Sequence, residues 1–435
     1  MRKARLLQGG EEEPHDAHHF EDQTNQQRRR SCCAKLVAAG EPMIRNLHVQ
    51  NFKSFQDVSI DLGRLNVLVG PNMSGKSNLI DVFRLLSRTV APAPGTYGLS
   101  NAILQMGGFE DLAWKGTDSR LISIALEGEG WPPLRPKEDA KWSYRIETVG
   151  DPHGRSMVQE ESLKLSTAEG ERNLINNPAG QRQFASLKGA SLGDVGFTDR
   201  SALEFERPDW EGNALREYIL KWRFYSLIPS SMRATNQSAA APFLLEHGDN
   251  FSSWLMTLQT KHDDEFERIA RVARDVFPEL EKLFTQPTQQ GSVFAATREK
   301  YLKRTTSINQ MSDGELVFIA LLSLIYSPLE LASPLLLIEE AENHLHLRLI
   351  VTLVELLKQV QQELPRARCP QVIMTTHSPH LVDQFNLDEL IVLEKREGAT
   401  TVARPGDKEH LRKLLEEEET GLGSLYYSGA LGGAS

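Results

Sequence analysis

The segment that most restricts the fold of this chain is Gly70-Pro71-Asn72-Met73-Ser74-Gly75-Lys76-Ser77. The apolar run before it, Leu65 to Val69, predicts a buried strand, and Ser77 to Leu86 carries apolar residues at helical spacing. A glycine-bearing loop between a strand and a helix can turn its N–H groups toward an anion, which the positive end of the helix dipole also favours. The sequence therefore predicts an α/β sheet with a phosphate-binding loop at the end of one strand.

Side chains of the same segment indicate a nucleotide with bound magnesium. Lys76 supplies a cation between the β- and γ-phosphates, and the Ser77 hydroxyl can reach Mg²⁺. Asn78 follows directly and is a further candidate contact. ATP and Mg²⁺ are therefore the expected ligands.

A second apolar run, Leu335 to Ile338, ends in the carboxylates of Glu339 and Glu340. Four apolar residues without alternation predict a strand covered on both faces, whose carboxyl end lies where open α/β sheets bind ligands. We expect Glu339 to hold Mg²⁺ through water and Glu340 to polarise the water that attacks the γ-phosphate. An apolar strand ending in acids is common by itself, so this interpretation depends on partner motifs.

Two further segments supply those motifs. Met311-Ser312-Asp313-Gly314-Glu315 precedes an apolar helix that runs to about Tyr326, and Thr375-Thr376-His377-Ser378-Pro379 follows the apolar strand Gln371 to Met374. In order and character, the four segments resemble the P-loop, signature, Walker B and switch histidine of ABC-type ATPases. The resemblance implies an α/β P-loop NTPase with an ABC-type head and a short helical or α+β insertion.

The sequence resembles most closely the RecF-like and SMC-like branch that acts on DNA, especially its compact bacterial members, often called AAA-family or OLD-like ATPases. The resemblance covers about 43–125 and 300–433. Because the chain ends soon after Gly433, we expect it to lack the nuclease domain that some relatives append. The resemblance rests on Asn51-Phe52-Lys53-Ser54-Phe55, the Ser312-Asp313-Gly314 signature, Glu339-Glu340-Ala341-Glu342-Asn343 with His344-Leu345-His346, and the Thr-Thr-His-Ser-Pro switch.

In that family, two heads close head-to-tail around two ATP molecules, so each site takes its signature from the other chain. The resemblance implies that Ser312 and Gly314 meet the γ-phosphate in trans, that His377 senses it, and that Asn343 lies in the D-loop linking the sites. Lys53 would touch phosphate, although a solvated lysine at a strand edge explains it equally well. The expected nucleotide contacts are Gly70, Pro71, Asn72, Met73, Ser74, Gly75, Lys76, Ser77, Asn78, Ser312, Gly314, Lys53 and Asn343. The expected catalytic residues are Glu340, His377 and Lys76, and the expected metal ligands are Ser77 and Glu339.

Several positions depart from the family pattern. Glu339 stands where the wider superfamily has aspartate, and Ala341 and Leu347 replace prolines, which leaves the D-loop backbone less constrained. Two glutamines, Gln105 and Gln237, lie in plausible transition regions, so the residue of the Q-loop stays open.

Four regions are expected: a disordered N-terminal extension (1–42), the first part of the head (43–125), an inserted lid or arm (126–300) and the second part of the head (301–435). The first region combines charge runs with no sustained period, and Met43 opens the first plausible strand. With 40% apolar residues, three cysteines and no apolar leader, the 435-residue chain is expected to be a soluble, cytoplasmic protein without a membrane partner.

The resemblance favours DNA as a partner, but a net charge of −10 gives no general attraction to phosphates, so a DNA site must be local. The candidate cluster is Arg298, Lys300, Lys303 and Arg304 with Tyr301. Solvated strand charges, or contacts to the phosphates of the nucleotide itself, are alternative explanations of this cluster. The leading hypothesis is a dimerising ATPase of DNA repair or defence against foreign DNA. The alternative is a slow ATPase scaffold that controls a separately encoded effector, a nuclease or toxin. A third hypothesis is the nucleotide-binding subunit of a membrane transporter. The Asn-Phe-Lys-Ser-Phe segment, the large insertion and the Thr-Thr-His-Ser-Pro switch all argue against it.

Overall fold

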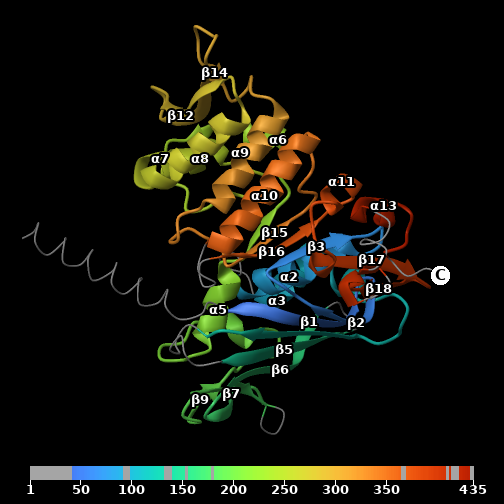
Figure 1. The fold of residues 1–435 in the computed structure, drawn as a ribbon. Coiled ribbons are helices and arrows are strands. Elements are labelled where there is room, and N and C mark those ends of the chain that lie inside the picture. Colours follow the sequence, from blue (N-terminus) through green and yellow to red (C-terminus); the bar gives the residue numbers. More distant parts are fainter. Residues whose placement is uncertain are drawn as a thin grey trace, which may run out of the picture.

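The computed structural model describes residues 42–91, 98–131, 140–151, 155–177, 181–363, 369–407, 411–412 and 421–431. Apart from Pro42, the expected N-terminal extension lies outside the described residues, as do Gly432 and Gly433. Two large sheets, a small third sheet and two groups of helices make up the fold (Figure 1).

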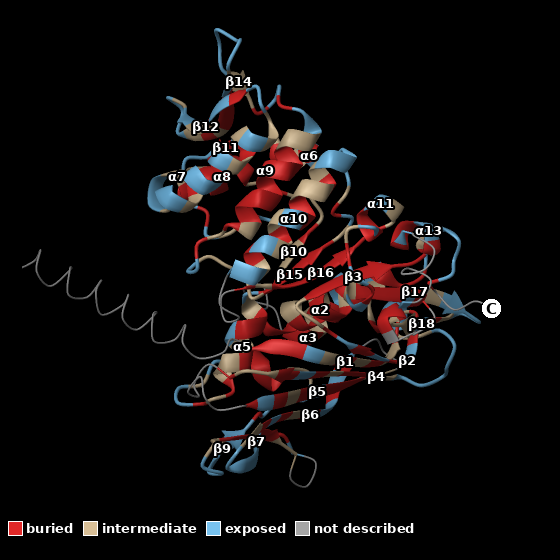
Figure 2. Ribbon diagram, viewed as in Figure 1, coloured by how far each residue is buried: buried red, intermediate tan, exposed pale blue. Residues whose placement is uncertain are grey.

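The central layer is a six-stranded sheet that is parallel except for its last strand. Each of its three middle strands is wholly buried, which agrees with their unalternating apolar sequences (Figure 2). The predicted strands before the phosphate loop (Leu65–Val69) and before the paired acids (Leu335–Ile338) are confirmed in one sheet, where Gln371–Thr375 lies between them. Its order is β10 (Arg223–Tyr225), β15 (Leu335–Ile338), β16 (Gln371–Thr375), β3 (Leu65–Val69), β17 (Leu390–Arg396) and β18 (Ala399–Ala403).

A second sheet of eight antiparallel strands covers one side of the molecule. Its order is β2 (Phe55–Asp61), β1 (Met43–Phe52), β4 (Leu121–Glu129), β5 (Lys141–Gly150), β6 (Ser156–Thr167), β7 (Gly170–Asn176), β8 (Gln183–Ala185) and β9 (Ser191–Asp194). Between the two sheets lie α2 (Lys76–Val90), α3 (Gly98–Gln105), α4 (Phe109–Leu112) and α5 (Asn213–Leu220) (Figure 1).

Helix α2 is the common element of this inner core. Its buried residues pack with side chains of both sheets, and Phe83 meets the Trp222 ring edge-on at 5.5 Å between centroids. Leu335 and Leu337 of β15 face the same core, whereas Leu336 and Ile338 face the other side of the sheet. Because alternate side chains of β15 face opposite sides of the sheet, the strand also sets the direction of the acids that follow it, Glu339 and Glu340.

The other face of the central sheet carries a helical layer and a small sheet (Figure 1). The helices are α6 (Pro229–Met232), α7 (Phe251–Lys261), α8 (Asp263–Val276), α9 (Asp313–Ile325), α10 (Leu347–Glu363), α11 (Pro379–Val382) and α13 (Leu422–Tyr427). The small sheet has the order β11 (Asn236–Gln237), β13 (Ser292–Glu299) and β12 (Leu280–Pro287), and β14 (Thr306–Ser307) also pairs with β13. Helix α9 is apolar on all sides because it lies at the centre of this layer.

Residues 126–300 contribute to every layer. They supply β5 to β9 to the antiparallel sheet, β10 to the parallel sheet, and α7, α8, β12 and β13 to the far layer. The sequence near 249–284 has helical patterns, but the last helix there ends at Val276 and Leu280–Pro287 is a strand. Within the described residues, none of the helices combines the length and apolarity needed to cross a bilayer.

Candidate nucleotide site

The phosphate loop leaves the carboxyl end of β3 and enters α2. Gly70 and Gly75 have φ of 153° and 107°, and Met73 adopts 65° despite its side chain. A side-chain carbon at Gly75 would lie 2.5 Å from Thr400 Oγ1 and 2.9 Å from Ser54 Oγ. Conformation and close packing therefore both require glycine at this position.

Three segments distant in sequence brace the loop. Thr400 of β18 donates to the Ser74 carbonyl (2.8 Å) and contacts Ser54 Oγ (2.7 Å), which also accepts from Asn78 Nδ2 (2.7 Å). The Tyr426 hydroxyl of α13 donates to the Gly70 carbonyl (3.1 Å). The loop is thus fixed by the β1–β2 turn, the β17–β18 hairpin and α13 together.

Lys76 is buried at the first position of α2. Its ammonium group donates to the carbonyls of Gly70 (2.7 Å) and Pro71 (3.0 Å). Burial lowers the pKa of Lys76 to about 8, while the negative charges of Glu340 and Glu342 oppose the shift. A cation held in so little water attracts phosphate strongly, because its own hydration is already lost.

Glu339 follows the face of Leu335 and Leu337 and therefore points toward α2. There its Oε1 pairs with Arg84 Nη2 at 3.1 Å. Arg84 also pairs with Asp81 (2.7 Å) and Glu246 (2.6 Å), and its guanidinium lies 5.3 Å from the centre of the Phe224 ring. The expected metal ligand is thus engaged by an arginine that sequence reasoning missed, since the two residues are 255 positions apart.

Lys53 belongs to the same ion-pair network. Its ammonium group meets Asp81 Oδ2 at 2.5 Å, and the residue itself lies in the turn between β1 and β2 with φ of 49°. The nearby Asn78 side chain bonds Ser54 of the same turn. Lys53 and Asn78, which were both predicted to contact the nucleotide, therefore lie at the first turns of α2, Asn78 within the helix and Lys53 beside it.

Glu340 adopts φ of 49°, which turns it away from the regular path of β15. Its N–H donates to Thr375 Oγ1 (3.0 Å), and its Oε2 accepts from Asn343 Nδ2 (2.5 Å). Its charge acts on both Lys76 and His377, so the structure brings these three sequence-predicted residues to one site.

Glu342 is a residue that the sequence interpretation did not single out. Its Oε1 accepts from Thr376 Oγ1 (2.7 Å) and from the N–H groups of His377 (2.8 Å) and Ser378 (3.2 Å). Its Oε2 is buried without a hydrogen-bond partner. The carboxylate therefore anchors the backbone of the switch segment, and its place in a run of three acids within four residues was the available signal.

His377 lies next to the buried ammonium group. Burial and then the positive charge of Lys76 lower the pKa of His377, whereas Glu340 and Glu342 act in the opposite direction. The imidazole is therefore biased toward its neutral form, which can still donate one hydrogen bond to a phosphate oxygen.

Ser312 caps the N-terminus of α9 in a capping box. Its hydroxyl accepts from the Glu315 N–H at 3.3 Å, and its own N–H donates to Glu315 Oε2 at 2.8 Å. Asp313 pairs with Arg233 (2.7 Å) and lies 3.6 Å from His344 Nδ1. The signature is thus attached to the segment that follows the paired acids.

Gly314 approaches the same segment closely. A side-chain carbon at Gly314 would lie 3.1 Å from the His344 carbonyl. The signature therefore packs on the segment after Asn343, in the helical layer.

Other sequence candidates lie elsewhere. Gln105 is exposed at the end of α3, and Gln237 is exposed on β11 of the small sheet. The basic cluster surrounds the loop between β13 and β14, at the end of the molecule opposite β7 and β9, where Tyr301 is 82% exposed (Figure 1).

The described residues contain no cluster of three or more His, Cys, Asp or Glu side chains able to hold a metal by themselves. Such a cluster is not required by a nucleotide-borne Mg²⁺, which keeps several waters and takes only one or two protein ligands. Ser77 at the exposed start of α2 fits this role, whereas Glu339 Oε1 is shared with Arg84.

Comparisons with known proteins agree with this geometry. Residues 198–383 match the family described as "AAA domain, putative AbiEii toxin, Type IV TA system", and residues 43–115 match "AAA ATPase domain". No curated protein matches the chain.

Solved structures of SMC heads share the fold. An SMC head bound to the C-terminal winged-helix domain of ScpA is 18% identical with a TM-score of 0.51, covering 83% of this chain and 97% of that one. A Pyrococcus furiosus SMC head with an extended coiled coil, bound to the C-terminal domain of ScpA, is 17% identical with a TM-score of 0.51, covering 87% and 100%. The two AAA matches support an ATPase, and the solved structures show that the chain shares the fold of SMC heads.

Proposed function

We propose that this SMC/RecF-like ATPase works as a dimerising switch, in which two copies close head-to-tail around two molecules of Mg-ATP. The observation that carries the proposal is the grouping of Lys76, Glu340 and His377 at the carboxyl edge of the parallel sheet. A buried cation can bind the phosphates, a carboxylate can act as the base, and a neutral histidine can donate a hydrogen bond to the γ-phosphate. Together these groups suit the hydrolysis of a phosphoanhydride.

Each of these residues has a separate role in the proposed reaction. Lys76 attracts the β- and γ-phosphates, Glu340 accepts the proton of the attacking water, and His377 donates to the γ-phosphate. Asn343 holds the Glu340 carboxylate in position. Mg²⁺, when bound, neutralises phosphate charge, and Ser77 and Glu339 would hold it.

The dimer follows from two exposed features. The N-terminus of α9 carries Ser312 and Gly314, and a helix N-terminus is a favourable partner for a phosphate of the other copy. Met73, in the phosphate loop itself, is 82% exposed, and closure against a second head would cover it. A monomer is then expected to hydrolyse ATP slowly.

For the cellular role, we infer defence against foreign DNA, with DNA repair as the related alternative. The description of the family that matches residues 198–383 names a toxin of a Type IV TA system, and this supports defence. The same description also supports the scaffold hypothesis, in which slow ATP turnover controls a separately encoded nuclease or toxin. Direct DNA binding would use the exposed loop that carries Lys303 and Arg304.

The first test is the mass in solution of Glu340→Gln with and without Mg-ATP, beside the ATP turnover of the wild type. Removal of the base while an acceptor is kept should trap a closed dimer, so the mass should double with ATP and turnover should be lost. The matched control is Glu355→Gln, the same change on an exposed face of α10, which should turn over ATP normally. An unchanged mass together with normal turnover in Glu340→Gln would refute the mechanism.

A second experiment separates the cellular roles. Duplex DNA should stimulate turnover of the wild type, and a Lys303→Ala/Arg304→Ala double variant should reduce the stimulation without changing the basal rate. If DNA has no effect and the trapped dimer instead retains one nuclease or toxin from the native host, the scaffold hypothesis is preferred.

A further inference from the structure

Helix α13 reaches the nucleotide site from the side of the switch segment. It lies beside α11 (Figure 1), the short helix that begins shortly after His377. Although α13 has only six residues, its Leu422 and Leu425 are buried in the same core as Leu381 of α11. The helix is therefore packed on the element that directly follows the switch histidine.

Both ends of this short helix are fixed. At its start, the Gly423 N–H donates to Asp383 Oδ1 at 2.6 Å, and a side-chain carbon at Gly423 would lie only 2.3 Å from the Pro379 carbonyl oxygen. At its end, Gly429 has φ of 79°, and two backbone hydrogen bonds close a Schellman motif. The packing of α13 therefore holds Tyr426 in one position.

The hydroxyl of Tyr426 and the ammonium group of Lys76 share one acceptor. Tyr426 Oη donates to the Gly70 carbonyl oxygen at 3.1 Å, and Lys76 Nζ donates to the same oxygen at 2.7 Å. A second hydrogen bond of Lys76 goes to the Pro71 carbonyl at 3.0 Å. A carbonyl oxygen has two lone pairs, so both donors can bind the Gly70 oxygen at once.

Binding of phosphates at Lys76 requires this arrangement to change. An ammonium group has three N–H donors, and two of those of Lys76 are directed at loop carbonyls. Because a lysine between the β- and γ-phosphates needs two donors for them, Lys76 must leave at least one carbonyl. Pro71 is exposed, so water can replace the lysine there, whereas Gly70 is buried. Among the described residues, Tyr426 is the donor that stays on the Gly70 oxygen.

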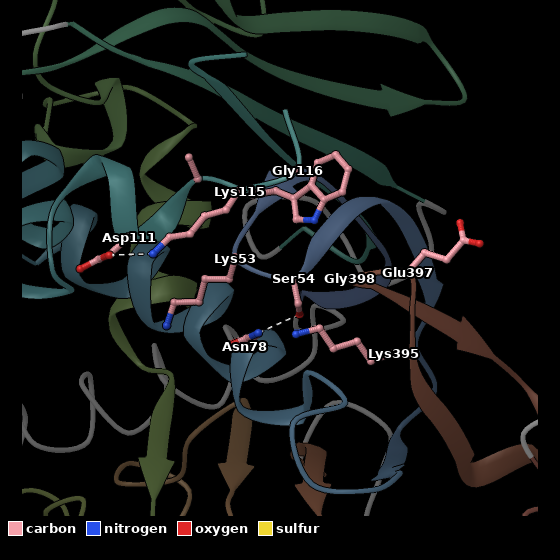
Figure 3. Close-up of a pocket in the computed structure, with 11 residues that line it drawn as sticks. Lys53, Ser54, Asn78, Asp111, Lys115, Gly116, Lys395, Glu397 and Gly398 are labelled. Carbon is pink, nitrogen blue, oxygen red and sulfur yellow. Dashed lines mark hydrogen bonds and ion pairs between the residues drawn. The ribbon is translucent and has the colours of Figure 1, made fainter. Parts of the chain in front are cut away.

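The other end of the phosphate loop is held without Tyr426. Ser54 Oγ accepts from Asn78 Nδ2 at 2.7 Å, as Figure 3 shows, and it contacts Thr400 Oγ1 at 2.7 Å. These contacts lie where the loop enters α2, whereas Gly70 begins the loop. Loss of the Tyr426 hydroxyl should therefore leave the path of the loop intact.

We propose that Tyr426 is a positioning residue for ATP, whose hydroxyl keeps the buried Gly70 carbonyl hydrogen-bonded when Lys76 turns to the phosphates. The inference rests on the proposed function, which places the phosphates at Lys76. Without this hydroxyl, the same step leaves a buried carbonyl oxygen unpaired, and the cost of that oxygen opposes phosphate binding. Helix α13, through its packing on α11, thereby contributes to ATP affinity.

The test is Tyr426→Phe, which removes the hydroxyl and keeps the ring. Calorimetry should show that Mg-ATP and magnesium tripolyphosphate both bind about 5- to 150-fold more weakly, because the lost hydrogen bond acts through the phosphates. The KM for ATP should rise by the same factor, with a much smaller change in kcat. Urea unfolding without nucleotide should hardly change, since Lys76 still satisfies the Gly70 carbonyl in that state.

Two further variants accompany this test. The matched control is Tyr427→Phe, the same change at the adjacent residue, which is 87% exposed, and it should bind both ligands normally. Gly423→Ala places a methyl group against the Pro379 carbonyl and should move α13 away from α11, so it should also weaken ATP binding. Normal ATP binding by Gly423→Ala would overturn the contribution assigned to the packing of α13.

Each other outcome has a distinct meaning. Normal ATP binding by Tyr426→Phe would overturn the assignment of Tyr426 while leaving the ATPase proposal intact. Weaker binding of ATP alone, with tripolyphosphate unchanged, would place Tyr426 against another part of the nucleotide and would also overturn it. A loss of stability to urea as large as the loss of binding would show that the hydroxyl has a structural role only. Failure of the wild type to bind either ligand would refute the proposed function itself.

Discussion

The burial of Lys76 predicts that ATP affinity falls as the pH rises through 8. Before ATP binds, burial holds the pKa of Lys76 at about 8, opposed in part by Glu340 and Glu342. The phosphates of ATP interact favourably only with the ammonium form, so binding raises this pKa and takes up a proton wherever the free lysine is neutral. Affinity should therefore be constant below pH 7.5 and decline above it.

The size of the effect follows from the pKa. A group of pKa about 8 is roughly 90% protonated at pH 7 and roughly 10% protonated at pH 9, so the apparent affinity should drop about tenfold over this range. At pH 8, each ATP bound should take up about half a proton.

Calorimetry checks both numbers. Titrations with Mg-ATP at pH 7, 8 and 9 give the affinity, and titrations in two buffers of different ionisation enthalpy give the proton uptake. The control is Lys76→Arg, whose guanidinium stays charged throughout, so that any binding it retains should not vary with pH. Constant wild-type affinity from pH 7 to 9, or no proton uptake at pH 8, would refute this account of Lys76.

Two further predictions concern residues that sequence reasoning missed. Glu342→Gln keeps the shape of the side chain but removes the charge of the carboxylate whose oxygen accepts three hydrogen bonds from the switch segment. The value of kcat should therefore fall roughly 10- to 100-fold while ATP affinity changes little. Steady-state kinetics measure both, and an unchanged kcat would contradict the anchoring role of Glu342. Arg84→Met leaves Glu339 without its partner and Asp81 with Lys53 alone, and it should lower the free energy of unfolding by about 2–4 kcal/mol. Urea denaturation should show a smaller loss for Glu246→Gln, whose carboxylate is more exposed, and equal losses would count against the Arg84 network.

The features that the sequence predicted well depend on local order. The strand before the phosphate loop, the helix after it and the buried strand before the paired acids are confirmed, because each is encoded by its own pattern of apolar residues. The switch strand and the signature helix are confirmed for the same reason.

The features that were missed depend on tertiary contacts. Leu280–Pro287 is a strand because it pairs with β13, although its sequence continues a helical pattern. The three residues of β10 become part of the central sheet only by pairing with β15. The strand alternation of β15 could have shown that Glu339 faces α2, but nothing in the sequence identifies Arg84 as its partner.

The bracing of the phosphate loop has a consequence for the order in which the protein matures. A ribosome makes Gly70 to Ser77 early, but Thr400 and Tyr426, which hold that loop, emerge more than three hundred residues later. Contacts of such long range form late in folding, because the chain between them must first be organised. A growing chain therefore carries the nucleotide motif long before it has a rigid nucleotide site. Tight ATP binding is accordingly expected of the completed, folded chain and not of the growing one.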